Sequence, residues 1–192
     1  MKTRLPCETP PSGACARLAR RVAGQIPVLV TERLRLRGPV VEDFPIFAEV
    51  VLGPRGTFLD IDTREDAWLD FAQMVAGWTL RGHGPWTVEP KDGGDPFGFV
   101  LLGFDQEDPE PELGYLFTGK AEGRGIAQEA ARAARDYAFD ELGWKTLTSY
   151  VTDGNTRSAA LAERLGARAE GHLPAPNADV MVYRYKAGEA RT

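Results

Sequence analysis

A glycine-containing turn between a strand pattern and a helix pattern constrains the fold of this chain more than any other feature. Residues 112–117 form an apolar, strand-like stretch, and the alanine-rich residues 128–142 indicate a helix. Between them, residues 122–127 read Glu-Gly-Arg-Gly-Ile-Ala. Because glycine has no Cβ to block an approach, successive backbone N–H groups can point outward at the start of the helix, where the helix dipole favours an anion. The sequence therefore predicts a strand–turn–helix unit that holds a phosphate.

The remaining pattern predicts an α/β fold, of the α+β type with a mixed sheet. Hydrophobic alternation and turn signals indicate further strands at residues 33–37, 86–88, 97–104, 146–151, 167–171 and 180–185, and further helices at residues 41–52, 63–81 and 157–165. Hairpin-length links join the middle strands, whereas the helix after the glycine turn makes the strands at its two ends parallel. We therefore expect one mixed sheet of seven strands, flanked by about four helices.

Composition restricts the class of protein. At 192 residues the chain fits a single domain, and its 43% hydrophobic and 27% charged residues are ordinary for a globular protein. The formal net charge of −5 argues against nucleic acid or an anionic membrane as a partner and slightly favours an amine substrate. No apolar run approaches the roughly 20 residues that span a bilayer, and the basic-then-apolar residues 17–30 lack a cleavage pattern. We expect a cytoplasmic protein.

The first 30 residues differ from the rest of the chain. They combine a proline-containing start with a short basic stretch, residues 14–23, that predicts one helix. We assign residues 1–30 to an N-terminal extension, 31–187 to the domain and 188–192 to a C-terminal tail. Cys7 and Cys15, the only cysteines, both lie in the extension, so no disulfide framework is implied. The extension is a candidate contact between the subunits of a homodimer.

The histidines do not indicate a metal site. His83 and His172 are the only ones, and neither has a cysteine or carboxylate partner at a metal-binding spacing. His83 lies in a glycine-rich loop before a strand, where we expect a surface histidine. We therefore expect no bound metal.

Four motifs occur in an order that resembles one known family. Residues 31–37 read Thr-Glu-Arg-Leu-Arg-Leu-Arg, residues 111–115 read Pro-Glu-Leu-Gly-Tyr, residues 123–130 read Gly-Arg-Gly-Ile-Ala-Gln-Glu-Ala, and Asn-Thr-Arg-Ser at 155–158 leads to Arg-Leu-Gly at 164–166. From residue 31 to about residue 186 the chain resembles the Gcn5-related N-acetyltransferases, and among them the group that acetylates the N-termini of ribosomal proteins and similar amines. The resemblance implies the acyl-CoA N-acyltransferase fold, whose sheet splays between its fourth and fifth strands.

The resemblance also implies a coenzyme site. Acetyl-CoA, the cosubstrate, would place its pyrophosphate on the turn and its pantetheine arm along the backbone of the central strand. An arm with two amides can pair like an added strand where a sheet opens. Glu122 departs from the usual glutamine or arginine of the turn, so we expect its side chain to point away from the phosphate. The residues assigned to coenzyme binding are Leu116, Phe117, Gly123, Arg124, Gly125, Ile126, Ala127 and Asn155.

Glu112 and Ser158 are the candidate catalytic residues. An alkylamine with a pKa near ~10 is protonated at neutral pH, so a base is useful, and Glu112 stands at the mouth of the central strand. The alternative is an ordinary charged residue that opens a strand. Alanine at position 162 replaces the tyrosine that is widespread in the family as the acid. Ser158 is then the candidate acid, unless its hydroxyl only bonds the helix backbone or the thiolate takes its proton from water.

The predicted function is acetyl-CoA-dependent N-acetylation of a primary amine by direct transfer in a ternary complex. The acceptor is a protein N-terminal α-amine or a small-molecule amine, and the sequence does not decide between them. A non-catalytic acyl-CoA-binding sensor is the alternative, motivated by Ala162 and Glu122. A dinucleotide-binding oxidoreductase fits less well, because Gln128 stands where that fingerprint has its third glycine.

Overall fold

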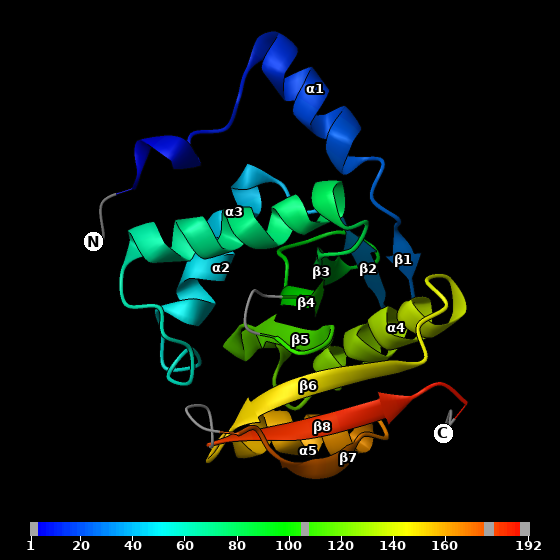
Figure 1. Ribbon diagram of the computed structural model, residues 1–192. Coiled ribbons are helices and arrows are strands. Elements are labelled where there is room, and N and C mark those ends of the chain that lie inside the picture. The colour runs from blue at the N-terminus through cyan, green and yellow to red at the C-terminus, as the bar shows by residue number, and fades with distance from the viewer. Residues whose placement is uncertain (1–3, 105–107, 175–178, 189–192) are drawn as a thin grey trace.

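One mixed sheet organises the computed structural model, which describes residues 4–104, 108–174 and 179–188 (Figure 1). Within these residues the sheet has eight strands in the order β1-β2-β3-β4-β5-β6-β8-β7. The strands are β1 (Leu29–Val30), β2 (Leu34–Arg37), β3 (Pro85–Pro90), β4 (Gly98–Gly103), β5 (Glu112–Phe117), β6 (Thr146–Thr152), β7 (Arg168–His172) and β8 (Val180–Lys186). All neighbours are antiparallel except β5 and β6, which confirms the predicted mixed sheet.

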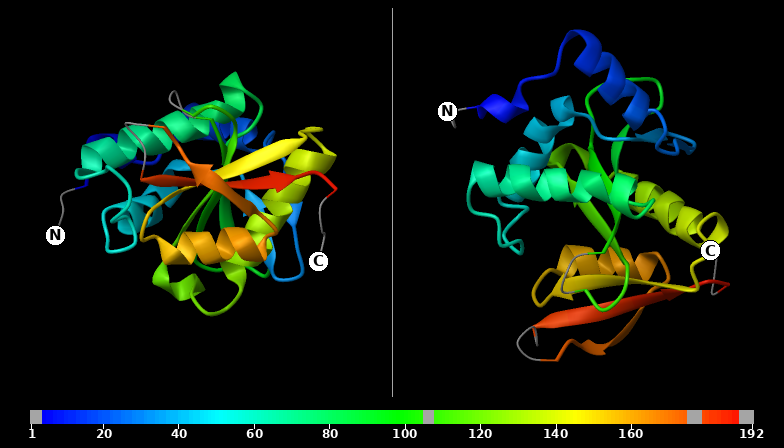
Figure 2. Two further views of the ribbon diagram at one scale, coloured as in Figure 1. Left: turned by 60° about the horizontal axis from the view of Figure 1, so that its bottom comes forward. Right: turned by 45° about the horizontal axis from the view of Figure 1, so that its top comes forward.

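Helices cover both faces of the sheet (Figure 2). On one face, Phe47 and Phe71 pack around Phe99 of β4. On the other face, small alanines such as Ala130 are fully buried beside Leu161, which brings the helices close to the strands. The α-helices in the described residues are α1 (Gly13–Ala23), α2 (Phe44–Val51), α3 (Arg64–Leu80), α4 (Ile126–Asp140) and α5 (Thr156–Arg164). Helices α2 and α3 cover the first face, and α4 and α5 cover the second. The helices predicted from periodicity are therefore confirmed.

The sheet opens between β5 and β6. β4 pairs with β5 over the whole of Glu112–Phe117. Across β5 and β6, by contrast, Glu112 and Thr148 are the single registered pair in the described part of the chain. Beyond this pair the two strands diverge, because β6 continues along β8 while β5 stays with β4. The fourth and fifth of the seven predicted strands correspond to β5 and β6, so the predicted splay is confirmed. Beyond Glu112, the edge of β5 that faces β6 has no strand partner among the described residues.

The sheet begins earlier than residue 31. The short strand β1 pairs with β2 through Leu29 opposite Leu36 and Val30 opposite Arg35. A strand this short has too few residues to produce an alternating pattern, so its sequence could not reveal it. It ties the end of the N-terminal extension to the sheet. At the other terminus, residues 189–192 of the predicted tail lie outside the described residues.

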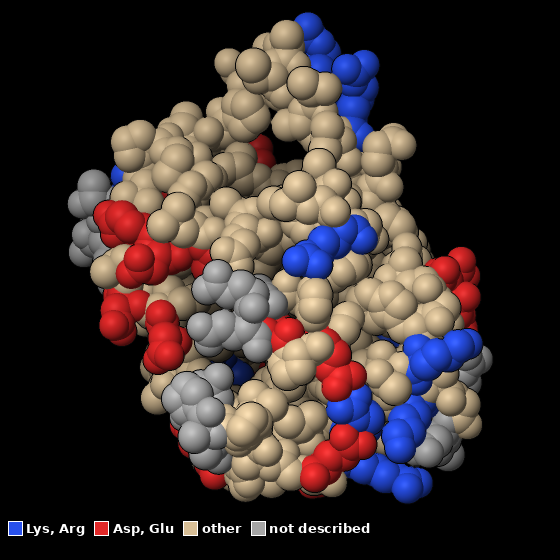
Figure 3. All heavy atoms as spheres, viewed as in Figure 1, with Lys and Arg blue, Asp and Glu red and all other residues tan. Residues whose placement is uncertain are grey.

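The N-terminal extension is anchored at two points. Near its start, the 3₁₀-helix η1 (Pro6–Glu8) buries Glu8, whose carboxylate accepts hydrogen bonds of 2.6 and 2.7 Å from Arg64 at the start of α3. Near its end, the Pro27 carbonyl accepts the indole N–H of Trp86 at 2.7 Å. Between these anchors α1 has no buried residue and stands away from the body of the molecule, with its basic side chains on the surface at the top of Figure 3.

His83 is not the surface residue that its loop predicted. Its side chain is buried, its Nδ1 lies 2.8 Å from the Leu102 carbonyl, and its ring packs edge-on against Trp144 at 5.1 Å. The loop after α3 folds inward over β4, which a glycine-rich sequence alone does not indicate. His83 therefore has a packing role in the core.

Candidate functional site

The turn before α4 has the geometry of an anion cradle. Gly123 and Gly125 adopt the left-handed φ angles of +68° and +71° that glycine accepts without strain. The first helical hydrogen bond runs from Glu129 N–H to the Gly125 carbonyl at 3.0 Å, so the amides of the three residues between them have no acceptor within the helix. A Cβ built on Gly123 would meet nothing within 4 Å. The turn therefore borders open space at Gly123.

The guanidinium of Arg33 lies beside this turn, a position that the sequence alone did not indicate. Arg33 donates to Glu129 through Nε at 2.7 Å and to the Arg124 carbonyl through Nη1 at 2.9 Å. Its Nη2 would be 3.4 Å from a Cβ on Gly125. Burial alone would raise the pKa of Glu129, but hydrogen bonds from Thr31 and Arg33 outweigh burial and lower that pKa. The segment before β2 thus holds the first turn of α4 and places a guanidinium next to the cradle.

The charged side chains of the turn itself interact with other residues of the protein. The Glu122 carboxylate forms an ion pair with Arg55, from the loop between α2 and α3, and therefore does not stand unpaired beside the cradle. Arg124 donates to the Lys120 carbonyl at 3.1 Å, and its guanidinium lies over the Phe97 ring at 5.0 Å. Of the predicted coenzyme-binding residues in the turn, Arg124 thus offers its backbone more readily than its side chain.

The open edge of β5 exposes alternate backbone groups. Thr118 N–H donates to the Phe97 carbonyl at 2.9 Å, which makes Leu116 and Phe99 a hydrogen-bonded pair of the antiparallel β4–β5 ladder. The amide and carbonyl of Leu116 consequently face β4, whereas those of Tyr115 and Phe117 face the splay. Of the two residues predicted to pair with a pantetheine arm, Phe117 has its backbone in a suitable position. The backbone of Tyr115 faces the splay as well. This orientation follows from the register of β4 and β5, so the sequence alone could not identify Tyr115.

Glu112 lies at the start of the splay, on the α2 and α3 face of the sheet. Side chains alternate along a strand, so Glu112 and Gly114 share this face. The Glu112 Oε1 would lie 3.1 Å from a Cβ on Gly114 and 3.5 Å from one on Gly103. The two glycines therefore leave room for the carboxylate. This placement agrees with the predicted position at the mouth of the central strand.

Asn155 and Ser158 meet at the start of α5. The Asn155 side chain accepts the Ser158 amide at 3.3 Å, so Asn155 is the N-cap of α5. The Ser158 carbonyl accepts the Tyr115 hydroxyl at 2.9 Å. Within the described residues the Ser158 hydroxyl makes no hydrogen bond. The alternative, in which this hydroxyl only bonds the helix backbone, is therefore not seen. Glu112 and Ser158 approach the splay from opposite faces of β5.

Buried hydroxyl groups occupy the space between β5 and β6. Ser149 donates to the Leu113 carbonyl at 2.6 Å, and its Oγ lies 3.1 Å from the Tyr185 hydroxyl. Burial raises the pKa of Tyr115 well above its usual range and raises that of Tyr185 to about 12. Both phenols are therefore neutral at physiological pH. They can donate protons in hydrogen bonds, but they cannot act as bases.

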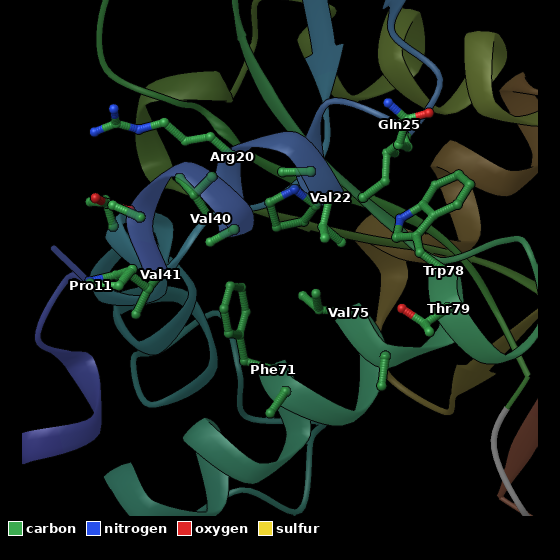
Figure 4. Close-up of a pocket in the computed structure, with 18 of the residues that line it drawn as sticks. Pro11, Arg20, Val22, Gln25, Val40, Val41, Phe71, Val75, Trp78 and Thr79 are labelled. Carbon is green, nitrogen blue, oxygen red and sulfur yellow. The ribbon is translucent and has the colours of Figure 1, made fainter. Parts of the chain in front are cut away.

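An apolar cavity lies elsewhere, between α1 and α3 (Figure 4). Its volume is about 960 Å³, and its walls are mostly apolar, with Val22 on the extension and Phe71, Val75 and Trp78 on α3. None of the residues predicted for catalysis or coenzyme binding lines it. It exists because α1 stands off the domain, and it is separate from the turn and the splay.

Two further features bear on the class of site. Among the residues that the structure describes, no group of three or more His, Cys, Asp or Glu side chains could hold a metal ion. Within the same residues, no helix has the length and apolar character needed to cross a membrane.

Comparison with known proteins gives consistent results. Residues 33–168 match the family model of the acetyltransferase (GNAT) domain. The uncharacterized protein YkkB of Bacillus subtilis (strain 168) is 30% identical over 168 residues, which are 82% of this chain and 95% of YkkB. An acetyltransferase from Agrobacterium tumefaciens str. C58 superposes with a TM-score of 0.77 at 39% identity, covering 83% of this chain and 94% of that one. RimL, a ribosomal L7/L12 α-N-protein acetyltransferase in complex with coenzyme A, shares the fold with a TM-score of 0.66 at 17% identity, over 83% and 98% of the two chains.

Proposed function

Because the chain belongs to the GNAT acetyltransferase family, we propose that it is an acetyl-CoA-dependent N-acetyltransferase that transfers an acetyl group directly to a primary amine in a ternary complex. One observation supports this proposal above the others. The open amides at the start of α4 and the open backbone edge of β5 belong to the same crossover. One ligand that carries both a phosphate and an amide-containing arm could use both.

The turn would hold the pyrophosphate of the coenzyme. Gly123 and Gly125 keep side chains out of the cradle, and the amides of Ile126 and Ala127 offer donors at the positive end of the helix dipole. The arm would then pair with the backbone of Tyr115 and Phe117, with Asn155 at the far side of the splay. The coenzyme supplies the acetyl thioester; the protein supplies binding, orientation and proton transfer.

Glu112 would remove a proton from the acceptor amine, directly or through a water. The neutral nitrogen attacks the thioester carbonyl carbon and the new C–N bond forms; the nitrogen then gives its second proton to solvent, and the C–S bond breaks as the coenzyme A thiolate leaves. A backbone N–H on the open edge of β5, that of Tyr115 or Phe117, would stabilise the oxyanion without reorganisation. Glu112 is suited to this role because it lies at the mouth of the splay with glycines around its carboxylate.

Ser158 would return a proton to the leaving thiolate. Its hydroxyl makes no hydrogen bond among the described residues and is therefore available to donate. Water is the competing donor, since a thiol pKa near ~8.5 lets coenzyme A leave as the thiolate. Ala162, fully buried in α5, has no hydroxyl to contribute. The absence of a side-chain acid at this position is also the observation that favours the second candidate, a non-catalytic acyl-CoA-binding sensor.

The acceptor would be a protein N-terminal α-amine or a small-molecule amine. RimL acts on the α-amino group of ribosomal L7/L12, as its name states, and its likeness to this chain is one of fold. The net charge of −5 suits a cationic amine in its approach to the protein.

Calorimetric titration with acetyl-CoA and with NAD tests the proposal at the level of binding. We expect saturable binding of acetyl-CoA at one site and no heat with NAD. Binding of NAD without acetyl-CoA would refute the proposal. Release of free thiol against a panel of peptide N-termini, polyamines, amino acids and aminoglycosides then separates an enzyme from a sensor.

A further inference from the structure

The loop between α2 and α3, residues 52–63, reaches both sides of the proposed coenzyme site. At one side, Arg55 pairs with Glu122, and its Nε and Nη2 would lie 3.9 Å from a Cβ on Gly119. At the other side, the Phe58 ring would lie 3.8 Å from a Cβ on Gly154, the residue before the α5 cap. This loop therefore spans from the turn before α4 to the turn before α5.

The loop holds Arg55 in a defined position. Gly56 N–H donates to the Gly53 carbonyl at 3.0 Å, and Leu59 N–H donates to the Gly56 carbonyl at 2.8 Å. A Cβ on Gly56 would lie 1.9 Å from the Val51 carbonyl, so the backbone next to Arg55 packs tightly against the end of α2. The Arg55 side chain is 25% exposed, compared with 58% for Glu122. The cation is thus the more firmly held partner of the pair.

Arg55 has donors to spare. A guanidinium presents five N–H groups in a planar fork, and the pair with Glu122 uses Nη2. Nε and Nη1 make no hydrogen bond in the part of the chain that the structure describes. A carboxylate beside an anion cradle would repel a phosphate, whereas a guanidinium paired with that carboxylate offsets its charge and keeps further donors for a phosphate. Arg55 therefore resolves the conflict that Glu122 creates at this turn.

We propose that Arg55 is a coenzyme-binding residue that contacts a phosphate of coenzyme A while it neutralises Glu122. This inference rests on the proposed function, because it takes the phosphate on the turn to be that of the coenzyme. It adds a side chain from the loop between α2 and α3 to a site otherwise built from β5, the turn and α5.

Calorimetry with coenzyme A, 3′-dephospho-coenzyme A and pantetheine tests the assignment. Arg55→Ala removes one charge-assisted contact. We therefore expect its Kd for coenzyme A to rise about tenfold. The affinity for pantetheine, which has no phosphate, should stay unchanged. An effect on both phosphorylated ligands assigns Arg55 to the pyrophosphate, and an effect on coenzyme A alone assigns it to the 3′-phosphate. Arg17→Ala, on the exposed α1, removes the same charge far from the site and should leave every Kd unchanged.

A second substitution separates charge from loop structure. In the Arg55→Ala background, Glu122→Gln removes the carboxylate that is left without its partner and should recover part of the lost affinity. Arg55→Lys should retain an intermediate affinity. An unchanged Kd in Arg55→Ala, or an equal loss for pantetheine, would overturn the assignment and leave the proposed function standing. Failure of the wild-type protein to bind coenzyme A would overturn both.

Discussion

The Tyr115 hydroxyl donates a 2.9 Å hydrogen bond to the Ser158 carbonyl and thereby joins β5 to α5 across the open part of the sheet. Tyr115 extends from the last strand before the glycine turn, and Ser158 lies in the first turn of α5. Within the described residues, β5 and β6 have one registered pair, Glu112 and Thr148. This contact is therefore one of the few that hold the two halves of the site at a constant spacing.

Removal of this contact should lower stability. Tyr115→Phe deletes the hydroxyl and its hydrogen bond to the Ser158 carbonyl, which should reduce the free energy of unfolding by about 1 kcal/mol in urea titrations. Tyr150→Phe is the matched control, because the Tyr150 hydroxyl makes a longer bond of 3.3 Å to the Glu110 carbonyl. A larger loss in Tyr150→Phe would show that the Tyr115 contact does not hold the splay.

A bulky residue in the cradle should abolish coenzyme binding. Gly125→Trp places an indole among the open amides before α4 and should eliminate the calorimetric signal for coenzyme A. Gly143→Trp is the control for strain and bulk, since Gly143 has a similar φ of +69° and open space around it at the other end of α4. If both variants are folded and both bind the coenzyme normally, the turn does not hold the phosphate.

Loss of the proposed base should reduce turnover and leave binding intact. We expect Glu112→Gln to lower kcat by about 100-fold, which is within the usual range for a general base. The coenzyme Kd should change little, because Glu112 faces α2 and α3 and lies away from the turn. Glu163→Gln, an exposed carboxylate on α5, is the control. A pH–rate profile of Glu112→Gln that coincides with that of the wild type would remove Glu112 from the mechanism.

The anchor of the N-terminal extension should depend on pH. A hydrogen bond from Arg64, which outweighs the effect of burial, lowers the pKa of Glu8 in the folded protein. A lowered folded-state pKa adds stability above the unfolded pKa of about 4.3, and this stability is lost as the pH falls toward the folded pKa.

Because the Arg64 side chain remains 18% exposed to solvent, the pair is partly screened, and we expect Glu8→Gln to cost about 1 kcal/mol at pH 7. In urea titrations, the difference in the free energy of unfolding between Glu8→Gln and the wild type should shrink as the pH falls below about 4. Glu49→Gln, on an exposed position of α2, should have no such pH-dependent effect. A difference for Glu8→Gln that persists unchanged in acid would show that the ion pair does not anchor the extension.

Much of the fold could be predicted because its signals are local. The Thr63 side chain accepts the Asp66 amide at 3.0 Å, a cap formed by residues three apart in the sequence, and Gly125 ends the glycine turn where α4 begins. β1 and the burial of His83 could not be predicted, because each depends on a partner far away in the sequence. The same holds at the site. Arg33 and Arg55 reach the turn through tertiary contacts, and the orientation of the Leu116 backbone follows from the register of β4 and β5.

Turnover of acetyl-CoA with an amine tests the central claim most directly. Free thiol should be released only when protein, acetyl-CoA and an acceptor are present together, with one acetylated amine, detected by mass spectrometry, for each thiol. Glu112→Gln should reduce this rate at an unchanged coenzyme Kd. Tight binding of acetyl-CoA with no thiol release against peptide N-termini, polyamines, amino acids or aminoglycosides would contradict the account and identify the protein as a coenzyme-binding module without catalysis.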